Sequence, residues 1–328
     1  MAKVLVIGDS VTDSYLATAN RSDSSLPGAY WAWVRYLFER DRIDAGSPDD
    51  AHLCHMLGAG SANGKKYGSG SSFKIGSTSY KAYAIGKGGW SAEDLNLPTF
   101  QSDTNINPFY DAETGKFSLK ACVDRLKTLD DDGVTRLTVG ETAGTEVVNA
   151  EAWDMCTPSH VVINLNHNSS LAEYEATIPE VVETIKREYP EMVVILMSID
   201  ETGTYNPQLY PQYRENEITL GGLHKKNVSI YQYIRENLED ESRGIYVCSG
   251  HLVQPAVESY PTLEYQSADS IGSDRANTRR IAYAKGSFGG PNWHPNNLAH
   301  AAWGYQLYSL IKYTLAKQEM DAASENDA

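Results

Sequence analysis

Two side chains near opposite ends of the chain have the chemistry of a nucleophile and a base. Ser10 ends the segment Gly8–Ser10, directly after the apolar run Val4–Ile7, and His294 lies in the segment Pro291–Asn297. A serine hydroxyl attacks a carbonyl carbon well only when a neighbouring base accepts its proton, and histidine is the usual base at neutral pH. Each feature alone is also typical of a turn or a helix cap. The combination indicates nucleophilic catalysis by a serine.

Two further polar segments follow apolar runs between these ends. Gly86–Ser91, with the sequence Gly-Lys-Gly-Gly-Trp-Ser, follows Tyr83–Ile85, and an asparagine-rich segment ends Val161–Ser169. Glycine allows tight turns and close backbone approach, and asparagine favours caps, so each segment taken singly is more typical of a turn than of a site.

The elements that must position these residues follow an alternating pattern. Short apolar runs alternate with amphipathic segments, which is typical of a parallel sheet covered by helices on both faces. Ligands of such sheets bind beyond the carboxyl ends of the strands, which is where Ser10 would lie. The expected strands are Val4–Ile7, Tyr83–Ile85, Val161–Leu165, Val193–Ile199 and Ile245–Cys248.

Four helices are expected from apolar spacing and helix signals. The first covers Ala29 to about Arg42, with an aromatic stripe facing the sheet; another begins at Pro179, because proline suits a first helical turn. The others cover His224–Leu238 and a segment from about Asn296. The last helix is expected to bury one face, made of Leu298, Ala302, Tyr305, Tyr308, Ile311 and Leu315.

The chain is interpreted as one domain over residues 1–316, followed by a polar, frayed tail over 317–328. Segments of about 58–80 and 100–158 interrupt the alternation and are interpreted as insertions on one sheet. Asn107–Phe117 is part of the second insertion.

Taken together, the serine, glycine, asparagine and histidine segments resemble, in that order, the four blocks of the SGNH hydrolases, also called GDSL esterases and lipases. The likeness extends from Gly8 to about Gly304, and Asn107–Phe117 resembles a segment of longer bacterial and phage-type members. It implies a three-layer α/β/α, flavodoxin-like fold with a mainly parallel central sheet and inserted loops. The G-x-S-x-G motif that other serine hydrolases carry in the middle of their sequence is absent.

By this resemblance Ser10 is the nucleophile and His294 the general base. The N–H groups of Ser10 and Gly89 and the side-chain amide of Asn168 would form the oxyanion hole, and Asp9 adjoins the nucleophile. Each preorganised donor of an oxyanion hole lowers the barrier by roughly 3 to 4 kcal/mol.

The sequence departs from the family pattern at the asparagine block and at the third triad position. The family's Gly-x-Asn-Asp is replaced by Asn166–Ser169, so a register slip of two residues would make Asn166 the donor in place of Asn168. Pro291 replaces the aspartate that orients the histidine. The carbonyl of Pro291, the amide oxygen of Asn292, or an aspartate from the preceding segment, Asp269 or Asp274, are the alternatives for that role.

Aromatic residues near these blocks suggest surfaces for stacking sugar rings. Trp90 and Trp293 adjoin block residues and are expected near the serine, whereas Trp31, Trp33 and most of the 21 tyrosines are expected to pack in the core or the insertions.

Composition excludes several classes of protein. A net charge of −15, from 28 basic and 43 acidic residues, argues against nucleic acid or an anionic membrane as the main partner. No apolar stretch is long enough for a membrane span or a signal peptide, although a removed leader would leave no trace. Widely spaced cysteines predict buried free thiols rather than a zinc or disulfide scaffold; they are Cys54, Cys122, Cys156 and Cys248.

The leading functional hypothesis is an esterase that removes short acyl groups, most plausibly acetyl, from a small-molecule or polysaccharide ester. It needs no cofactor and no metal. The alternatives are a lipase or thioesterase on the same site, or a binding or virion-structural module with a decayed site. A zinc deacetylase is disfavoured because H-E-x-x-H is absent and His52 with His55 is only a loose pair, and no P-loop is present.

Overall fold

The computed structural model describes most of the chain. The described ranges are 1–13, 25–48, 53–58, 61–62, 65–66, 69–100, 102–128, 157–199, 220–250, 262–264, 281–283 and 297–326.

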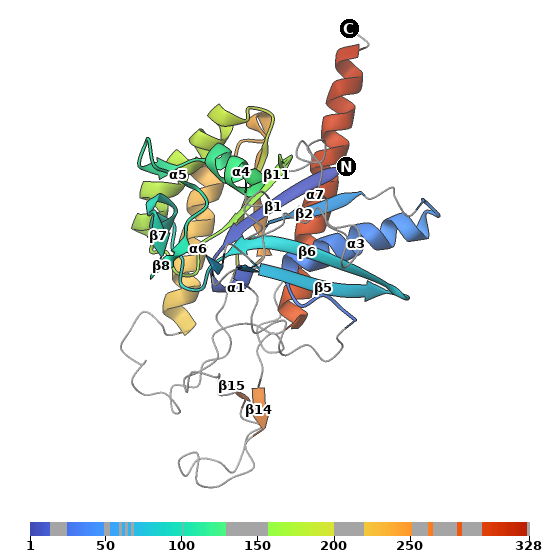
Figure 1. The fold of residues 1–328 in the computed structure, drawn as a ribbon, viewed down its shortest axis with the longest axis horizontal. Coiled ribbons are helices and arrows are strands. Elements are labelled where there is room, and N and C mark those ends of the chain that lie inside the picture. The colour runs from blue at the N-terminus through green and yellow to red at the C-terminus, as the bar shows by residue number, and fades with distance from the viewer. Residues whose placement is uncertain are drawn as a thin grey trace.

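A seven-stranded central sheet forms the middle layer (Figure 1), with β2 paired to β1 beside the order β13-β12-β11-β1-β6-β5. All its pairings are parallel except the β5–β6 hairpin. The segment β2-β1-β11-β12-β13 has the strand order of flavodoxin-like folds, whose topological switch point lies between β1 and β11. The strands are β1 (Ala2–Gly8), β2 (Cys54–Leu57), β5 (Ser69–Ile75), β6 (Thr78–Gly86), β11 (His160–Asn164), β12 (Val193–Ser198) and β13 (Ile245–Ser249).

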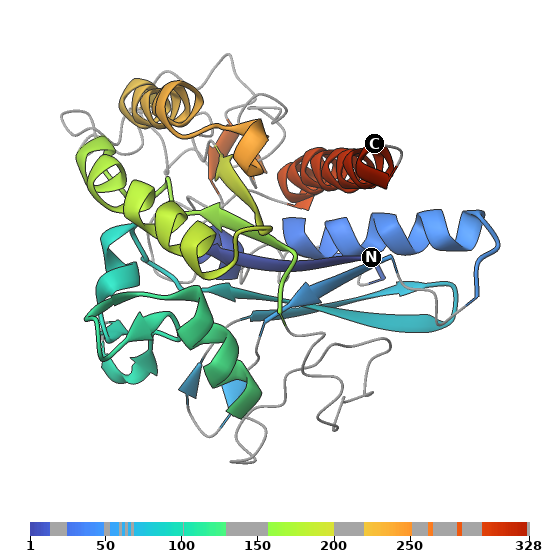
Figure 2. The same ribbon diagram turned by 90° about the horizontal axis from the view of Figure 1, so that it is seen from above.

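Helices cover both faces of this sheet (Figure 2), and two apolar clusters form the core. Alternate β1 residues supply the two clusters, Leu5 and Ile7 on one face and Val4 and Val6 on the other. The first cluster lies against α4 (Leu119–Thr128), α5 (Leu171–Glu188) and α6 (Leu220–Asn237), and the second against α3 (Tyr30–Asp44) and α7 (Asn297–Asn326). The predicted three-layer α/β class and mainly parallel sheet are confirmed.

Short elements occupy the segments that the sequence suggests are insertions. The hairpin β5–β6 joins the edge of the central sheet, so much of residues 69–80 belongs to the main fold. The remaining short elements are α1 (Ser10–Asp13), β3 (Ser61–Ala62), β4 (Lys65–Lys66), η1 (Glu93–Asn96), β7 (Thr99–Phe100), β8 (Ser102–Ile106), β9 (Tyr110–Asp111), β10 (Lys116–Phe117), η4 (Glu241–Arg243), β14 (Thr262–Glu264) and β15 (Ile281–Tyr283).

The predicted start of a helix at Pro179 is wrong. Helix α5 begins at Leu171, where Ser170 and Glu173 form a capping box, and Pro179 lies inside it. A proline in a helix interior costs about 3 kcal/mol or more. Burial of an apolar face on both sides of the proline offsets that cost; the face includes Tyr174, Ile178, Val181, Val182 and Ile185.

The buried face of α7 also differs from the prediction. Tyr305 is 53% exposed, whereas Ile311 is buried as predicted, and Tyr308 and Leu315 pack partly buried against the same cluster. The fully buried residues are spaced four apart; they are Ala299, Trp303, Leu307 and Ile311. The helix carries apolar residues on all of its sides, so the spacing of apolar residues in the sequence does not determine which side is buried. The segment from Lys317, expected to be frayed, continues α7 as helix to Asn326.

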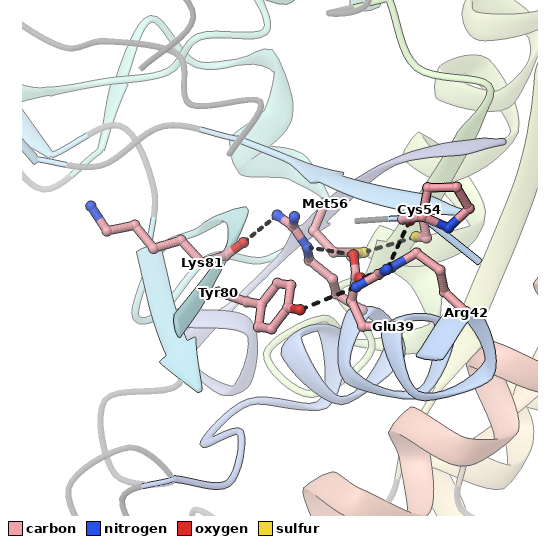
Figure 3. Close-up of polar contacts among 8 residues, drawn as sticks. Glu39, Arg42, Cys54, Met56, Tyr80 and Lys81 are labelled. Carbon is pink, nitrogen blue, oxygen red and sulfur yellow. Dashed lines mark hydrogen bonds and ion pairs between the residues drawn. The ribbon is translucent and has the colours of Figure 1, made fainter. Parts of the chain in front are cut away.

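Helix α3 carries a buried ionic cluster towards its carboxyl end (Figure 3). Glu39 accepts a hydrogen bond from Arg42 Nε at 2.8 Å and pairs with Arg35 at 3.8 Å, and all three side chains are at most 2% exposed. Arg42 also donates to the Tyr80 hydroxyl, and Arg35 donates to the Lys81 carbonyl, so the cluster joins α3 to β6.

Three of the cysteines, Cys54, Cys122 and Cys248, are buried free thiols as predicted, and burial raises the pKa of Cys54 and of Cys248 to about 12. Cys156 lies outside the described residues. Within the described ranges no helix combines the length and hydropathy needed to cross a membrane.

Candidate active site

The carboxyl ends of three adjacent strands, β6, β1 and β11, are in register beside the topological switch point. Gly8, the last residue of β1, pairs with Asn164 of β11 and with Gly86 of β6. The serine, glycine and asparagine segments each continue from one of these strand ends. The fold therefore brings together three of the four sequence blocks, at the place where open α/β sheets bind ligands.

Ser10 begins the short helix α1 and is half-buried. The fully buried Asp9 accepts a hydrogen bond from the Val11 N–H through Oδ1 at 2.9 Å, and its carbonyl accepts one from the Asp13 N–H. The Asp9 side chain thus caps the helix that begins with the serine.

Close packing beneath Ser10 explains the two glycines that end β1 and β6. A Cβ added to Gly8 would lie 1.9 Å from Thr12 Oγ1, and one added to Gly86 would lie 2.5 Å from the Asp13 nitrogen. Any larger residue would displace α1. The sequence signal for both is a glycine that ends an apolar run.

The glycine segment forms a turn beside Ser10. The Lys87 N–H donates to the Gly8 carbonyl, and the Trp90 N–H closes the turn on the Lys87 carbonyl at 3.2 Å. Gly89 has a φ of 84°, which glycine adopts without the strain of a side chain. A Cβ built on Gly88 would lie 3.9 Å from Ser10 Cβ, so this turn directly adjoins the serine.

Trp90 does not offer the exposed stacking surface that the sequence suggests. Its side chain is fully buried and packs in the core at 6.4 Å from the Phe109 ring. The turn at Gly89 directs the next side chain into the protein, so Trp90 anchors the glycine segment from below. Trp31 and Trp33 are buried in α3, as expected.

The hydrogen bonds of the two asparagines differ in a way that bears on the oxyanion donor. Asn166 is fully buried, and its amide nitrogen donates to the Ile199 carbonyl at 2.7 Å and to Asn227 Oδ1 at 3.1 Å. Both amide hydrogens are therefore used within the core. Asn168 is half-buried and donates one hydrogen bond, to the Trp90 carbonyl at 3.1 Å. Its second amide hydrogen has no acceptor among the described residues.

A neighbouring serine also joins the asparagine segment to the glycine segment. Ser169 Oγ accepts a hydrogen bond from the Ala92 N–H at 2.8 Å and donates to the Leu165 carbonyl at 2.6 Å. With the Asn168 contact, this fixes the loop after β11 against the loop after β6. Sequence reasoning did not single out Ser169, although a hydroxyl replaces the family's carboxylate there.

The histidine segment falls outside the described residues, and with it Pro291, Asn292, Trp293 and His294, as do Asp269 and Asp274. Helix α7 begins three positions after His294, at Asn297. Of the loose histidine pair that disfavoured a zinc site in the sequence, His55 is buried in β2, and His52 lies outside the described residues. No cluster of three or more His, Cys, Asp or Glu side chains within the described ranges has the arrangement of a metal site.

Comparison with known proteins yields structural similarity only. No family model and no curated protein matches the chain. A carbohydrate esterase family 3 protein from Talaromyces cellulolyticus matches with 13% identity and a TM-score of 0.47, covering 96% of this chain and 99% of that one. An acetyl esterase mutant with acetate ion matches with 11% identity and a TM-score of 0.43, over 96% and 99% of the two chains. An α/β hydrolase from the metagenome of Lake Arreo, Spain, matches with 11% identity and a TM-score of 0.37, over 94% of each chain.

Proposed function

We propose that the protein is a serine esterase or O-deacylase of the SGNH type that removes short acyl groups, in particular acetyl, from a carbohydrate. The observation that supports it most is the convergence of the Ser10, Gly88–Gly89 and Asn168 segments at the ends of β1, β6 and β11. Three sequence segments predicted to act together are adjacent at the switch point of the sheet.

In the proposed acylation step Ser10 Oγ attacks the ester carbonyl carbon while its proton passes to His294. The carbonyl oxygen becomes an oxyanion, which the N–H groups of Ser10 and Gly89 and the second amide hydrogen of Asn168 stabilise. Collapse of this intermediate breaks the bond to the alcohol oxygen, and that oxygen takes the proton from His294. Acyl-Ser10 and the free sugar hydroxyl are the products.

Deacylation repeats these steps with water as the nucleophile. His294 takes a proton from the water, the hydroxide adds to the acyl carbon, and the proton then returns to Ser10 Oγ as the carboxylic acid leaves. In the absence of a triad aspartate, the carbonyl of Pro291 or the amide oxygen of Asn292 would accept the other imidazole N–H. Loss of the acid slows such enzymes without abolishing turnover, so the proposal accommodates Pro291.

The engagement of Asn166 in the core supports Asn168 as the donor. Use of Asn166 would break two buried hydrogen bonds before any oxyanion formed. The use of Asn168 requires no such loss, because its bond to the Trp90 carbonyl orients the amide and leaves one hydrogen for the substrate.

The first test is covalent labelling with a serine-directed phosphonate, read by intact mass and peptide mapping. We expect a single adduct on Ser10. It should be absent in Ser10→Ala, and it should form much more slowly in His294→Ala. Ser309→Ala, which changes an exposed serine of α7, is the matched control and should label normally. Turnover of a small aryl acetate should likewise be normal in Ser309→Ala, strongly reduced in His294→Ala and absent in Ser10→Ala.

The outcome also separates the alternatives. A folded protein that several serine reagents leave unmodified would favour a binding or virion-structural module, which the replacement of the triad aspartate by Pro291 already suggests. Labelling with faster turnover of long-chain esters or thioesters than of acetylated sugars would favour a lipase or thioesterase. Both results would contradict the proposed deacylase.

A further inference from the structure

A tyrosine below Ser10 joins two of the converging segments. The hydroxyl of Tyr30 lies 2.8 Å from Thr12 Oγ1, in the helix that begins with Ser10, and accepts a hydrogen bond from Asn164 Nδ2 at 3.2 Å. Asn164 ends β11, four residues before Asn168. Tyr30, Thr12 and Asn164 are fully buried, and burial raises the pKa of the Tyr30 phenol well above its usual range. The contact is therefore between neutral groups at any working pH.

A second contact from α3 reaches the same helix. The indole N–H of Trp31 donates to the Thr12 carbonyl at 2.9 Å, so consecutive residues of α3 hold both the side chain and the backbone of Thr12. The position of α1, and of Ser10 with it, depends on where α3 begins.

A buried histidine extends this network to α7. His300 Nδ1 accepts a hydrogen bond from the Tyr30 N–H at 3.1 Å, its ring stacks on the Tyr30 ring at 6.0 Å, and its side chain is buried. Tyr30 is the first residue of α3, where backbone N–H groups have no carbonyl acceptor inside the helix. An imidazole can accept at Nδ1 only while that nitrogen carries no proton, so the bond requires neutral His300.

Close helix packing fixes the relative placement of α3 and α7 around this bond. A Cβ added to Gly304 would lie 2.4 Å from Trp33 Cβ and 2.8 Å from the Tyr30 carbonyl oxygen. Trp303 packs edge-on to both rings, at 6.3 Å from Tyr30 and 5.2 Å from His300. The first two turns of α7 are thus held against the first turn of α3.

We infer that Tyr30 and His300 are positioning residues of the proposed deacylase. Together they connect the Ser10 helix, the strand that leads to Asn168 and the start of α7, which follows His294 in sequence after two intervening residues. The inference depends on the proposed function, and neither residue is assigned a contact with substrate. Both act through the relative placement of the nucleophile, the base and the oxyanion donor, where a displacement of 1 Å costs about 100-fold in rate.

The test compares substitutions that keep or remove the acceptor at Nδ1. The amide oxygen of His300→Asn occupies nearly the place of Nδ1, whereas His300→Leu has no acceptor, and Tyr30→Phe removes the hydroxyl contacts to Thr12 and Asn164. We measure the rate of phosphonate labelling at Ser10, and kcat and KM for an aryl acetate, per folded molecule.

We expect His300→Leu to lower the labelling rate and kcat by about 10- to 100-fold with KM within about threefold of wild type, because geometry rather than substrate binding is lost. His300→Asn should recover most of the rate. Tyr30→Phe should lower kcat by about tenfold.

His160 supplies the matched control. It is also a buried histidine bonded to α7, through Nε2 to Thr314 Oγ1 at 2.9 Å, but it lies at the amino end of β11, away from Ser10. His160→Leu should lower stability and leave the labelling rate of the folded fraction unchanged.

Failure of the inference and failure of the proposed function give different results. If wild-type protein is not labelled at Ser10, the proposed function is wrong, and the inference is wrong with it. If wild type is labelled and His300→Leu reacts at the wild-type rate, or His160→Leu slows labelling equally, the inference alone is wrong. Should His300→Leu fail to fold, His300→Gln replaces it, because its amide reaches the place of Nε2 and leaves Nδ1 vacant; wild-type rates in that variant would equally overturn the inference.

Discussion

The two ends of the central sheet use buried polar groups in different ways. At the carboxyl end, such groups hold the segments that carry the proposed site residues: Asn168 and Ser169 bind the loop after β6, and Tyr30 contacts the short helix that begins with Ser10. Towards the amino end, they join the long helices and strands of the fold: His160 bonds β11 to α7, and Arg42 bonds α3 to β6 through the Tyr80 hydroxyl.

This difference separates stability from function. A buried bond between the long elements fixes the fold, whereas a buried bond to a segment that carries site residues fixes the position of those residues. Substitutions at the amino end should therefore change the free energy of unfolding, and substitutions of the groups that form or hold the site at the carboxyl end should change the reaction rate first.

The largest expected effect is loss of stability on removing the charge of Glu39. Glu39→Gln leaves Arg35 and Arg42 buried without their shared carboxylate, and breaking a buried ionic pair costs about 3 to 5 kcal/mol. Urea unfolding measures it, with Asp44→Asn as control, because the Arg40–Asp44 pair at 3.8 Å is exposed. A loss below about 1 kcal/mol, the value typical of surface pairs, would show that the buried cluster does not stabilise the fold.

The next effect is on rate and lies at the carboxyl end. Asn168→Ala should lower kcat by about 100- to 1000-fold with little change in melting temperature, because one oxyanion donor is lost. Asn166→Ala should instead lower stability by about 1 to 3 kcal/mol, because it leaves the Ile199 carbonyl unpaired in the core. The reverse pattern would make Asn166 the donor and shift the register of this segment by two residues.

Acid should destabilise the protein through His160. Burial lowers the pKa of His160 in the folded protein to about 4, from 6.5 when unfolded. The neutral side chain stabilises the fold fully above pH 6.5, and this contribution is lost as pH falls towards 4, because only the unfolded chain takes up the proton readily. The loss amounts to about 3 kcal/mol. Urea midpoints between pH 7 and pH 4 measure it, and a His160→Gln variant should fall less steeply over that interval; equal slopes would contradict the assignment.

Strand positions were the most predictable part of the fold. Val4–Ile7 is a continuous apolar run, and Val161–Leu165 and Val193–Ile199 are apolar except for Asn164 and Ser198, as expected for strands buried on both faces. Each run contains most of an observed strand. Strand β2, Cys54–Leu57, was missed because His55 interrupts its apolar run.

Features that depend on tertiary contacts were not predictable from local sequence. Pro179 is tolerated inside α5 because the helix packs on the core, and the buried side of α7 is set by its close approach to α3 at Gly304. In the candidate site, the resemblance to the SGNH blocks implied that the Ser10, Gly89 and Asn168 segments lie together, and the three segments are adjacent in the structure. Tyr30 was assigned only to the core, because its hydroxyl contacts come from residues 18 and 134 positions away.

The smallest expected effect concerns an exposed ion pair at the amino end. It tests whether charged pairs at this end stabilise the fold because they are buried or because of where they lie. Arg243 and Glu183 form an exposed ion pair at 2.9 Å that links the start of β13 to α5, with side chains 42% and 59% exposed. The arginine lowers the pKa of Glu183, but water and salt screen a pair this exposed. A double-mutant cycle with Arg243→Ala and Glu183→Ala should give a coupling free energy below about 1 kcal/mol that falls further in 0.5 M salt. A coupling as large as the effect of Glu39→Gln would mean that charge at this end stabilises the fold irrespective of burial, and the contrast between the two ends of the sheet would then be one of charge alone.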